Sequence, residues 1–120
     1  RCRMIETNAR RHGALNLHVV KGAALAALAH LPDPRCVLVG GGGKDTRKIV
    51  EKSLARLRPG GRLVATAILQ ETHARLLKIR PGDRIEIVEV SVRKSKTVGP
   101  GVMMSPANPV ILHVYGKRAR

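Results

Sequence analysis

The sequence predicts an α/β protein with a mostly parallel sheet, and three observations carry this prediction. A short apolar run, Val37–Val39, precedes four consecutive glycines and a pattern typical of a helix. An apolar run without alternation is typical of a strand buried on both faces, as in a parallel sheet covered by helices. Helix and strand patterns alternate down to residue 78. Two strand patterns then follow without a helix between them, which predicts an antiparallel hairpin at the C-terminal end.

The first third of the chain predicts two helices and a strand. A helical pattern spans residues 2–12, and Gly13 is well placed to end it. Leu15–Val20 alternates apolar and polar residues, which predicts a strand. Ala23–Leu31 is rich in alanine and leucine and precedes Pro32, which predicts a second helix.

The remaining patterns continue the alternation. Asp45 or Thr46 is expected to cap the helix that follows the glycines. In the strand at 84–92 the apolar residues change from odd to even positions. A bulge near Val88 is expected to return them to one core-facing side. The expected elements are a helix at 45–57, strands at 62–68, 84–92 and 109–115, a helix at 70–78, and a long basic loop at 93–108.

Composition limits the protein to one domain and points to an anionic partner. The 120 residues include 23 Lys and Arg against 8 Asp and Glu, a net charge of +15. Such a balance favours binding of nucleic acid, acidic lipid, or a ligand with carboxylates or phosphates. Cys2 and Cys36 form no C-x-x-C motif, and we expect two reduced, buried thiols in a cytoplasmic protein. No apolar run approaches the ~20 residues of a membrane span, so we expect no membrane partner.

The four glycines, Gly40–Gly43, follow the strand at its carboxyl end. Without Cβ atoms this backbone is free to adopt positive φ, and a ligand is free to approach it closely. Ligands of open α/β sheets bind beyond the carboxyl ends of the strands. We therefore interpret the glycines as a ligand-facing loop, and the alternative is a flexible connector.

Several motifs resemble one enzyme family. The order of elements, together with Leu57–Val64 (Leu-Arg-Pro-Gly-Gly-Arg-Leu-Val), resembles the latter part of class I S-adenosylmethionine-dependent methyltransferases. With Val37–Gly43, Ala65–Thr72 and Gly101–Val110, the likeness narrows to the decarboxylating precorrin-6B methyltransferases of cobalamin biosynthesis and covers essentially all 120 residues. The resemblance implies one incomplete, Rossmann-like methyltransferase domain that lacks its first two strands and belongs to a longer natural protein.

The resemblance also implies the reaction and the cofactor. The family methylates and decarboxylates a precorrin tetrapyrrole with S-adenosylmethionine, and the cofactor is expected near Gly22, Ala23, Gly40 and Gly41. The family's glycine-rich cofactor loop and its ribose-binding acid would both precede Arg1, and Ala23 stands where the family usually has an acidic residue. We therefore expect the chain by itself to bind the cofactor weakly and to be a poor methyltransferase.

A tetrapyrrole with many carboxylates suggests a basic substrate site. Arg and Lys recognise carboxylates by charge-assisted hydrogen bonds, and methionines are suited to lining a flat pocket. Lys44 and Arg47 flank the glycines, and three more cations lie in the late loop. The expected substrate-binding residues are Gly42, Gly43, Lys44, Arg93, Lys94, Lys96, Met103 and Met104. The alternative is a solvated basic surface, with the methionines filling the core.

The sequence leaves the catalytic residues unknown. The five histidines show no i, i+4 pair, so no metal site is expected. Methyl transfer from a sulfonium needs mainly in-line positioning, so it requires no visible catalytic dyad. Without its first two strands the sheet has unpaired edges, unless strand 15–20 pairs directly with 37–39. Because an unpaired edge can pair with another copy of the chain, a homo-oligomer is a possible partner state.

Two rival functions remain open on the sequence. One is a basic RNA-binding or tRNA-methyltransferase-like domain, which the high positive charge favours. The near absence of aromatic residues makes nucleic acid an unlikely partner, because single-stranded RNA is bound largely by base stacking. The other is an inactive fragment.

Overall fold

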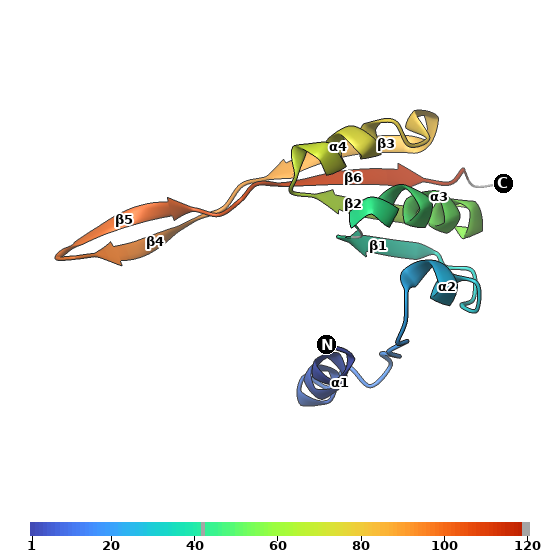
Figure 1. The fold of residues 1–120 in the computed structure, drawn as a ribbon, viewed down its shortest axis with the longest axis horizontal. Helices are drawn as coiled ribbons and strands as arrows, with labels where there is room; N and C mark the ends of the chain where they lie inside the picture. The colour runs from blue at the N-terminus through green and yellow to red at the C-terminus, as the bar shows by residue number, and fades with distance from the viewer. Residues whose placement is uncertain (42, 119–120) are drawn as a thin grey trace. The chain divides into compact units, whose positions relative to one another are not determined.

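The computed structural model describes residues 1–41 and 43–118 and divides into two compact units, Arg1–Pro32 and Asp33–Arg120. The first unit contains two helices, α1 (Cys2–Arg11) and α2 (Ala24–Leu28) (Figure 1). Gly13, with φ of +72°, follows α1 where the sequence predicts its end. Among the described residues, no helix is both long and apolar enough to cross a membrane.

The strand predicted at Leu15–Val20 is wrong. This segment begins with a turn, in which the amide of Leu17 bonds to the carbonyl of Ala14, and it carries no strand pairing. A strand needs a neighbour to satisfy its backbone, and the described residues of the first unit supply none. Among the described strand pairs, residues 37–39 pair with β2 and not with this segment. The helix predicted at 23–31 is also shorter than expected, because α2 ends at Leu28.

The second unit follows the predicted order of elements. Its regular elements are β1 (Cys36–Gly40), α3 (Thr46–Arg56), β2 (Arg62–Ala67), α4 (Gln70–Leu77), β3 (Arg84–Val90), β4 (Arg93–Val98), β5 (Gly101–Pro106) and β6 (Val110–Gly116), with short 3-10 turns η1 (Gly43–Asp45) and η2 (Pro81–Asp83). Six of the eight helices and strands in this unit match patterns read from the sequence. The two others, β4 and β5, replace a predicted loop.

Four strands form the main sheet in the order β1-β2-β6-β3. Strands β1 and β2 are parallel, and β6 is antiparallel to both β2 and β3. Consequently β1, β2 and β3 run in one direction and only β6 is reversed (Figure 1). The predicted α/β class, with a mostly parallel sheet and an antiparallel C-terminal pair, is confirmed. Strands β1 and β3 are the two edges of this sheet.

Helices α3 and α4 cover one face of the sheet, and the core lies beneath them. The alternating residues of β2, with Leu63 and Ala65 fully buried, show the strand periodicity of a half-covered sheet. Helix α3 contributes the predicted apolar stripe, and Tyr115 enters from β6. The buried core is Val39, Val50, Leu54, Leu57, Leu63, Ala65, Ala67, Leu76, Ile79 and Tyr115. On the opposite face, Leu38 of β1 remains 77% exposed.

The bulge in β3 lies earlier than predicted. The register with β6 shifts between Arg84 and Glu86, not at Val88. From Ile87 onward the strand alternates regularly, so Ile87 lies beside His113 on the helix-covered face and Val88 on the other. All residues of β3 after Arg84 are exposed. An edge strand of this kind has no single core face. The order of its apolar residues therefore does not locate the bulge, and the prediction of a bulge near Val88 is wrong.

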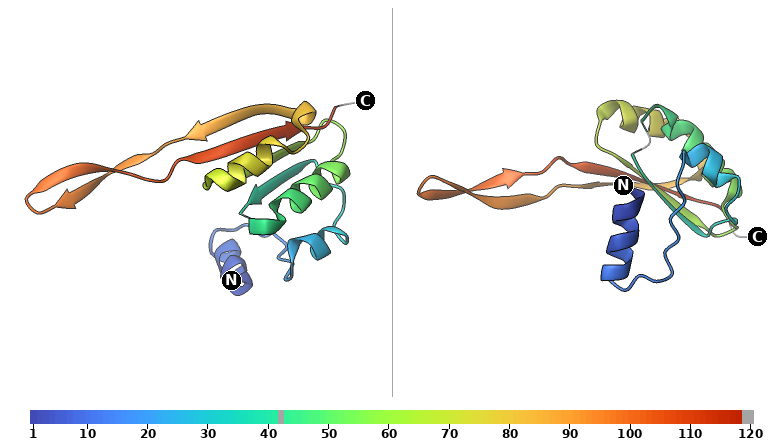
Figure 2. Two further views of the ribbon diagram at one scale, coloured as in Figure 1. Left: turned by 45° about the horizontal axis from the view of Figure 1, so that its top comes forward. Right: turned by 60° about the horizontal axis from the view of Figure 1, so that its bottom comes forward.

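The loop predicted at 93–108 is also wrong. Strands β4 and β5 pair in register, from Arg93 with Pro106 to Val98 with Gly101, and form a separate two-stranded sheet, here called the ribbon. Gly99, with φ of +55°, turns the chain between them. The ribbon continues β3 and β6 away from the main sheet, as both views of Figure 2 show. The Lys and Arg residues of β4 are typical of exposed edge strands.

The two cysteines are free, but the structure corrects their expected burial. Cys36 is exposed at the start of the edge strand β1, and Cys2 is only half-buried in α1. The expectation of two buried thiols is therefore wrong. The physical reason for Cys36 is its place on an outer strand, where only one neighbour covers it.

Candidate functional site

The carboxyl ends of β1, β2 and β3 lie at one edge of the main sheet, because these strands run in the same direction. The glycine loop follows β1 at this edge, and α4 begins there after β2. The ribbon leaves the sheet from the same edge, at the end of β3 (Figure 2). This edge is where open α/β sheets bind ligands, and we call it the carboxyl edge.

The glycine loop is held by a buried hydroxyl. The Oγ1 of Thr46, at the start of α3, donates a 2.8 Å hydrogen bond to the carbonyl of Gly43 and lies 3.4 Å from the carbonyl of Gly41. Thr46 is only 1% exposed. Asp45 is the N-cap residue of α3, but its side chain makes no capping bond. The predicted side-chain cap by Asp45 or Thr46 is therefore wrong, because the Thr46 hydroxyl turns back to the carbonyls of the glycine loop.

Glycine is required in this loop by its backbone. Gly41 has φ of +85° and Gly43 of +52°, a region that L residues with a Cβ rarely adopt. A Cβ at either position would meet no atom within 4 Å, so the loop borders open space in which a ligand has room. Gly42, a predicted substrate-binding residue, lies outside the described residues.

The predicted cofactor-binding residues fall in both units. Gly40 ends β1, next to Gly41, and a Cβ there would lie 4.0 Å from the Oγ1 of Thr66 on β2. Gly22 has φ of +138° and Ala23 is the N-cap residue of α2, both in the first unit. Gly40 and Gly41 lie together at the carboxyl edge of the second unit.

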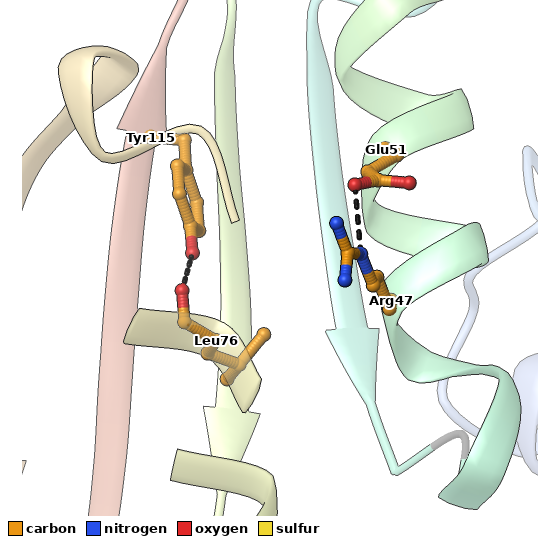
Figure 3. A network of polar contacts seen from close by, with 4 residues as sticks. All are labelled: Arg47, Glu51, Leu76 and Tyr115. Carbon is orange, nitrogen blue, oxygen red and sulfur yellow. Dashed lines mark hydrogen bonds and ion pairs between the residues drawn. The ribbon is translucent and has the colours of Figure 1, made fainter. Parts of the chain in front are cut away.

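The cations expected beside the loop have different surroundings. Lys44 is exposed within η1. The Nε of Arg47 instead forms a 3.0 Å ion pair with Glu51, one turn further along α3 (Figure 3). Arg75 of α4 was not predicted, yet its Nη1 lies 3.5 Å from the carbonyl of Gly43. Lys44 and Arg75 are thus the cations that the structure places at the loop.

The ribbon separates the other predicted substrate residues onto two faces. Residues directly opposite in an antiparallel pair share a face, and the faces alternate along each strand. Lys96 pairs with Met103, and Lys94 lies two residues earlier on the same face. Arg93 and Met104 lie on the other face. All five are exposed. The methionines therefore do not fill a core. A single flat ligand on one face of the ribbon would touch either Lys94, Lys96 and Met103 or Arg93 and Met104.

Two histidines, one on α4 and one on β6, are in contact. The Nδ1 of His73, in the first half of α4, is 2.9 Å from the Nε2 of His113 on β6. His113 is fully buried, with Tyr115 two residues along the same strand, whereas His73 is half-buried. The sequence gives no sign of this pair, because His73 and His113 lie 40 residues apart and only the fold brings them together.

Burial determines the charge of the histidine pair. The pKa of His113 is lowered from 6.5 to about 4, first by burial and then by the positive charges of His73 and Arg84. His113 is therefore neutral near pH 7. Its Nδ1 is buried and has no hydrogen-bond partner. Among the described residues, no three His, Cys, Asp or Glu side chains gather as metal ligands.

Another hollow lies at the opposite edge of the sheet. Its volume is about 360 Å³, and it is lined by residues at the amino ends of β2 and β3 and the end of β6, including Arg62, Arg84 and Lys117. It contains none of the predicted site residues. The candidate functional site is therefore the carboxyl edge, where the glycine loop, the start of α4 and the base of the ribbon lie.

Comparison with known proteins agrees with this architecture. The chain is 36% identical over 114 residues to a probable cobalt-precorrin-6B C(15)-methyltransferase (decarboxylating) of Methanothermobacter thermautotrophicus, which covers 92% of this chain and 59% of the relative. It is 34% identical to a decarboxylating precorrin-6Y C(5,15)-methyltransferase of a Sinorhizobium species, over 92% of this chain and 26% of that protein. The chain thus spans about three fifths, or less, of these relatives.

A solved structure shows the same fold. The precorrin-8w decarboxylase of Methanobacterium thermoautotrophicum superposes with a TM-score of 0.85 and 33% identity, over 96% of this chain and 63% of that one. Residues 1–117 match the precorrin methyltransferase domain as a family. The chain belongs to the precorrin methyltransferase family.

Proposed function

We propose that this chain serves S-adenosylmethionine-dependent methylation and decarboxylation of a precorrin tetrapyrrole in cobalamin biosynthesis. The observation that carries the proposal is the match to decarboxylating precorrin-6B methyltransferases over nearly the whole chain. The open glycine loop at the carboxyl edge supports it, because a ligand has room there. Because the chain spans less than two thirds of these relatives, the complete reaction is assigned to the whole protein.

The glycine loop fits the cofactor in one respect. Gly40 and Gly41 present bare backbone beside open space, as a closely approaching ligand requires. S-adenosylmethionine supplies an activated methyl group when it is bound. The chain's own contribution is to hold the loop through Thr46 and to present cations at the edge, with Lys44 exposed there.

The substrate class explains the charge. A precorrin carries carboxylates, and a net charge of +15 steers such an anion to the protein. Lys44, Arg75 and one face of the ribbon are the groups proposed to meet it. Counting against an RNA-binding function, the ribbon carries no aromatic residue on which bases could stack.

A binding comparison tests the proposal. We would titrate uroporphyrin, a carboxylated tetrapyrrole, and a tRNA against the same protein at two salt concentrations. The expected result is binding of the tetrapyrrole with a modest salt dependence, and weak binding of tRNA. Tight tRNA binding that falls steeply with salt, together with no tetrapyrrole response, would replace the proposal by the RNA-binding alternative.

A further inference from the structure

We propose that His73 is a substrate-recognition residue, and that buried His113 positions it so that its Nε2–H donates a hydrogen bond to a carboxylate of the substrate. The inference rests on the proposed function, because it names a residue that would contact that substrate. Its starting point is the 2.9 Å contact between the Nδ1 of His73 and the Nε2 of His113.

The outer nitrogen of His73 is available for a ligand. The described part of the chain offers the His73 ring no second hydrogen bond. The Nε2 of His73 is not among the buried polar atoms that lack a partner, whereas the Nδ1 of His113 is. Since His73 is half-buried, its Nε2 is therefore the nitrogen that reaches solvent.

The buried partner determines the tautomer. A 2.9 Å contact between two imidazole nitrogens needs one proton between them. If His73 were the donor, His113 would carry its own proton on Nδ1, and that N–H would be buried without an acceptor. Buried backbone N–H groups without a partner are rarer than buried carbonyls without one, and we apply the same order to the ring nitrogens. His113 is accordingly the Nε2–H tautomer and donates to the Nδ1 of His73, which leaves the proton of His73 on Nε2.

The position of His73 directs this donor to the carboxyl edge. His73 lies on the fourth residue of α4, the helix that starts at the carboxyl end of β2. Two residues further on, Arg75 reaches the carbonyl of Gly43 in the glycine loop. The helix that carries His73 thus contacts the loop proposed to border the ligand. A fixed N–H donor on the helix that also carries Arg75 suits a carboxylate held at this edge.

Nitrogen NMR tests the arrangement directly. In the full chain labelled with 15N, the spectrum of the imidazole nitrogens distinguishes the two tautomers of each histidine. We expect His73 with its proton on Nε2 at pH 7, and a mixture of tautomers in His113→Gln, where the donor to Nδ1 has a different geometry. Addition of mellitate, a benzene polycarboxylate, is expected to shift the Nε2 resonance of His73.

Binding measurements supply the second test. We expect His73→Ala to weaken uroporphyrin binding about tenfold, and His73→Gln to retain part of the affinity, because its amide keeps a donor near the Nε2 position. Lys78→Ala, exposed at the other end of α4, is the matched control and is expected to bind like the unaltered protein. Circular dichroism checks that each variant is folded.

The outcomes separate this inference from the proposed function. Unchanged uroporphyrin binding by folded His73→Ala overturns the inference and leaves the function standing. No uroporphyrin binding by the unaltered protein, with a clear mellitate shift at His73, overturns the function and retains carboxylate recognition by His73. A His73 proton on Nδ1, or no mellitate shift, overturns the inference whatever the tetrapyrrole does.

Discussion

The hydroxyl of Tyr115 donates a 2.8 Å hydrogen bond to the carbonyl of Leu76, and so ties β6 to the last turn of α4 (Figure 3). Tyr115 and Leu76 are both fully buried. The same carbonyl also accepts a 3.1 Å hydrogen bond from the amide of Ile79, so the Tyr115 hydroxyl is its second partner. Nη1 of Arg84 approaches the same carbonyl at 3.4 Å.

We expect Tyr115→Phe to lower the free energy of unfolding by about 1 kcal/mol, because it removes one buried hydrogen bond while the Leu76 carbonyl keeps the Ile79 amide and the longer Arg84 contact. Urea denaturation measures the change. Arg84→Met is the companion variant, and the double variant is expected to lose more than the sum of the two, since each donor partly replaces the other. Strict additivity would show that the two donors act independently.

Stability is expected to depend on pH through His113. Its pKa is about 4 in the folded protein and 6.5 in the unfolded chain, so the unfolded state binds the extra proton between these values. Stability is therefore complete above pH 6.5, falls as the pH decreases toward 4, and loses up to about 3 kcal/mol over this window. Urea denaturation between pH 7 and pH 5 measures it. His113→Gln is expected to flatten this slope, and an unchanged slope would contradict the assignment.

A glycine comparison tests the loop. Gly41→Val is expected to lower the free energy of unfolding by about 1–3 kcal/mol, because a β-branched residue at φ of +85° is strained. Gly82→Val is the matched control. Gly82 lies in η2, is exposed and has an ordinary φ, and a Cβ added there would meet no atom within 4 Å. Thermal denaturation of both variants measures the difference, and equal, negligible losses would indicate a plain flexible loop.

The two faces of the ribbon make different predictions. A flat macrocycle on one face gains apolar contact from Met104 and Val102 and a bidentate bond from Arg93. We expect Arg93→Ala to weaken uroporphyrin binding about tenfold and Lys96→Ala, on the other face, to have little effect. Fluorescence titration measures both. The sequence alone predicted a loss for both variants, and equal losses would favour a diffuse basic surface over a one-sided site.

The cofactor prediction concerns the chain by itself. The 120-residue chain is expected to bind S-adenosylmethionine weakly, because Ala23 stands where the resemblance places an acidic residue. Isothermal titration calorimetry measures the affinity. A dissociation constant in the ~micromolar range, which corresponds to about 8 kcal/mol of binding, would contradict this expectation.

The sequence predicted the elements whose patterns are local and buried. Strand β2 and helix α3 have strong periodicity because each has one covered face, and their bounds were found within about two residues. The ribbon was missed because both of its faces are exposed, so no apolar alternation marks it. Leu15–Val20 shows the reverse error, since alternation without a neighbouring strand does not make a strand.

The site was predicted in part for a similar reason. The glycine loop could be located because glycine at a strand end has a direct backbone consequence, which the positive φ of Gly41 bears out. The pair of His73 and His113 depends on where β6 inserts between β2 and β3. No spacing in the sequence encodes that placement, and only the strand order brings the two rings together.

The ribbon also has a consequence for the order of folding. All pairs between β4 and β5 join residues close in the chain, from Val98 with Gly101 outward to Arg93 with Pro106. Hairpins of this kind form on the microsecond timescale. As it zips from its turn, it brings Val90 and Val110 together, which are the first pair of β3 and β6 at that end. The entropy cost of closing the loop between β3 and β6 is then met in small steps. The pairing of β3 with β6, although distant in sequence, is therefore expected to form as fast as a local hairpin.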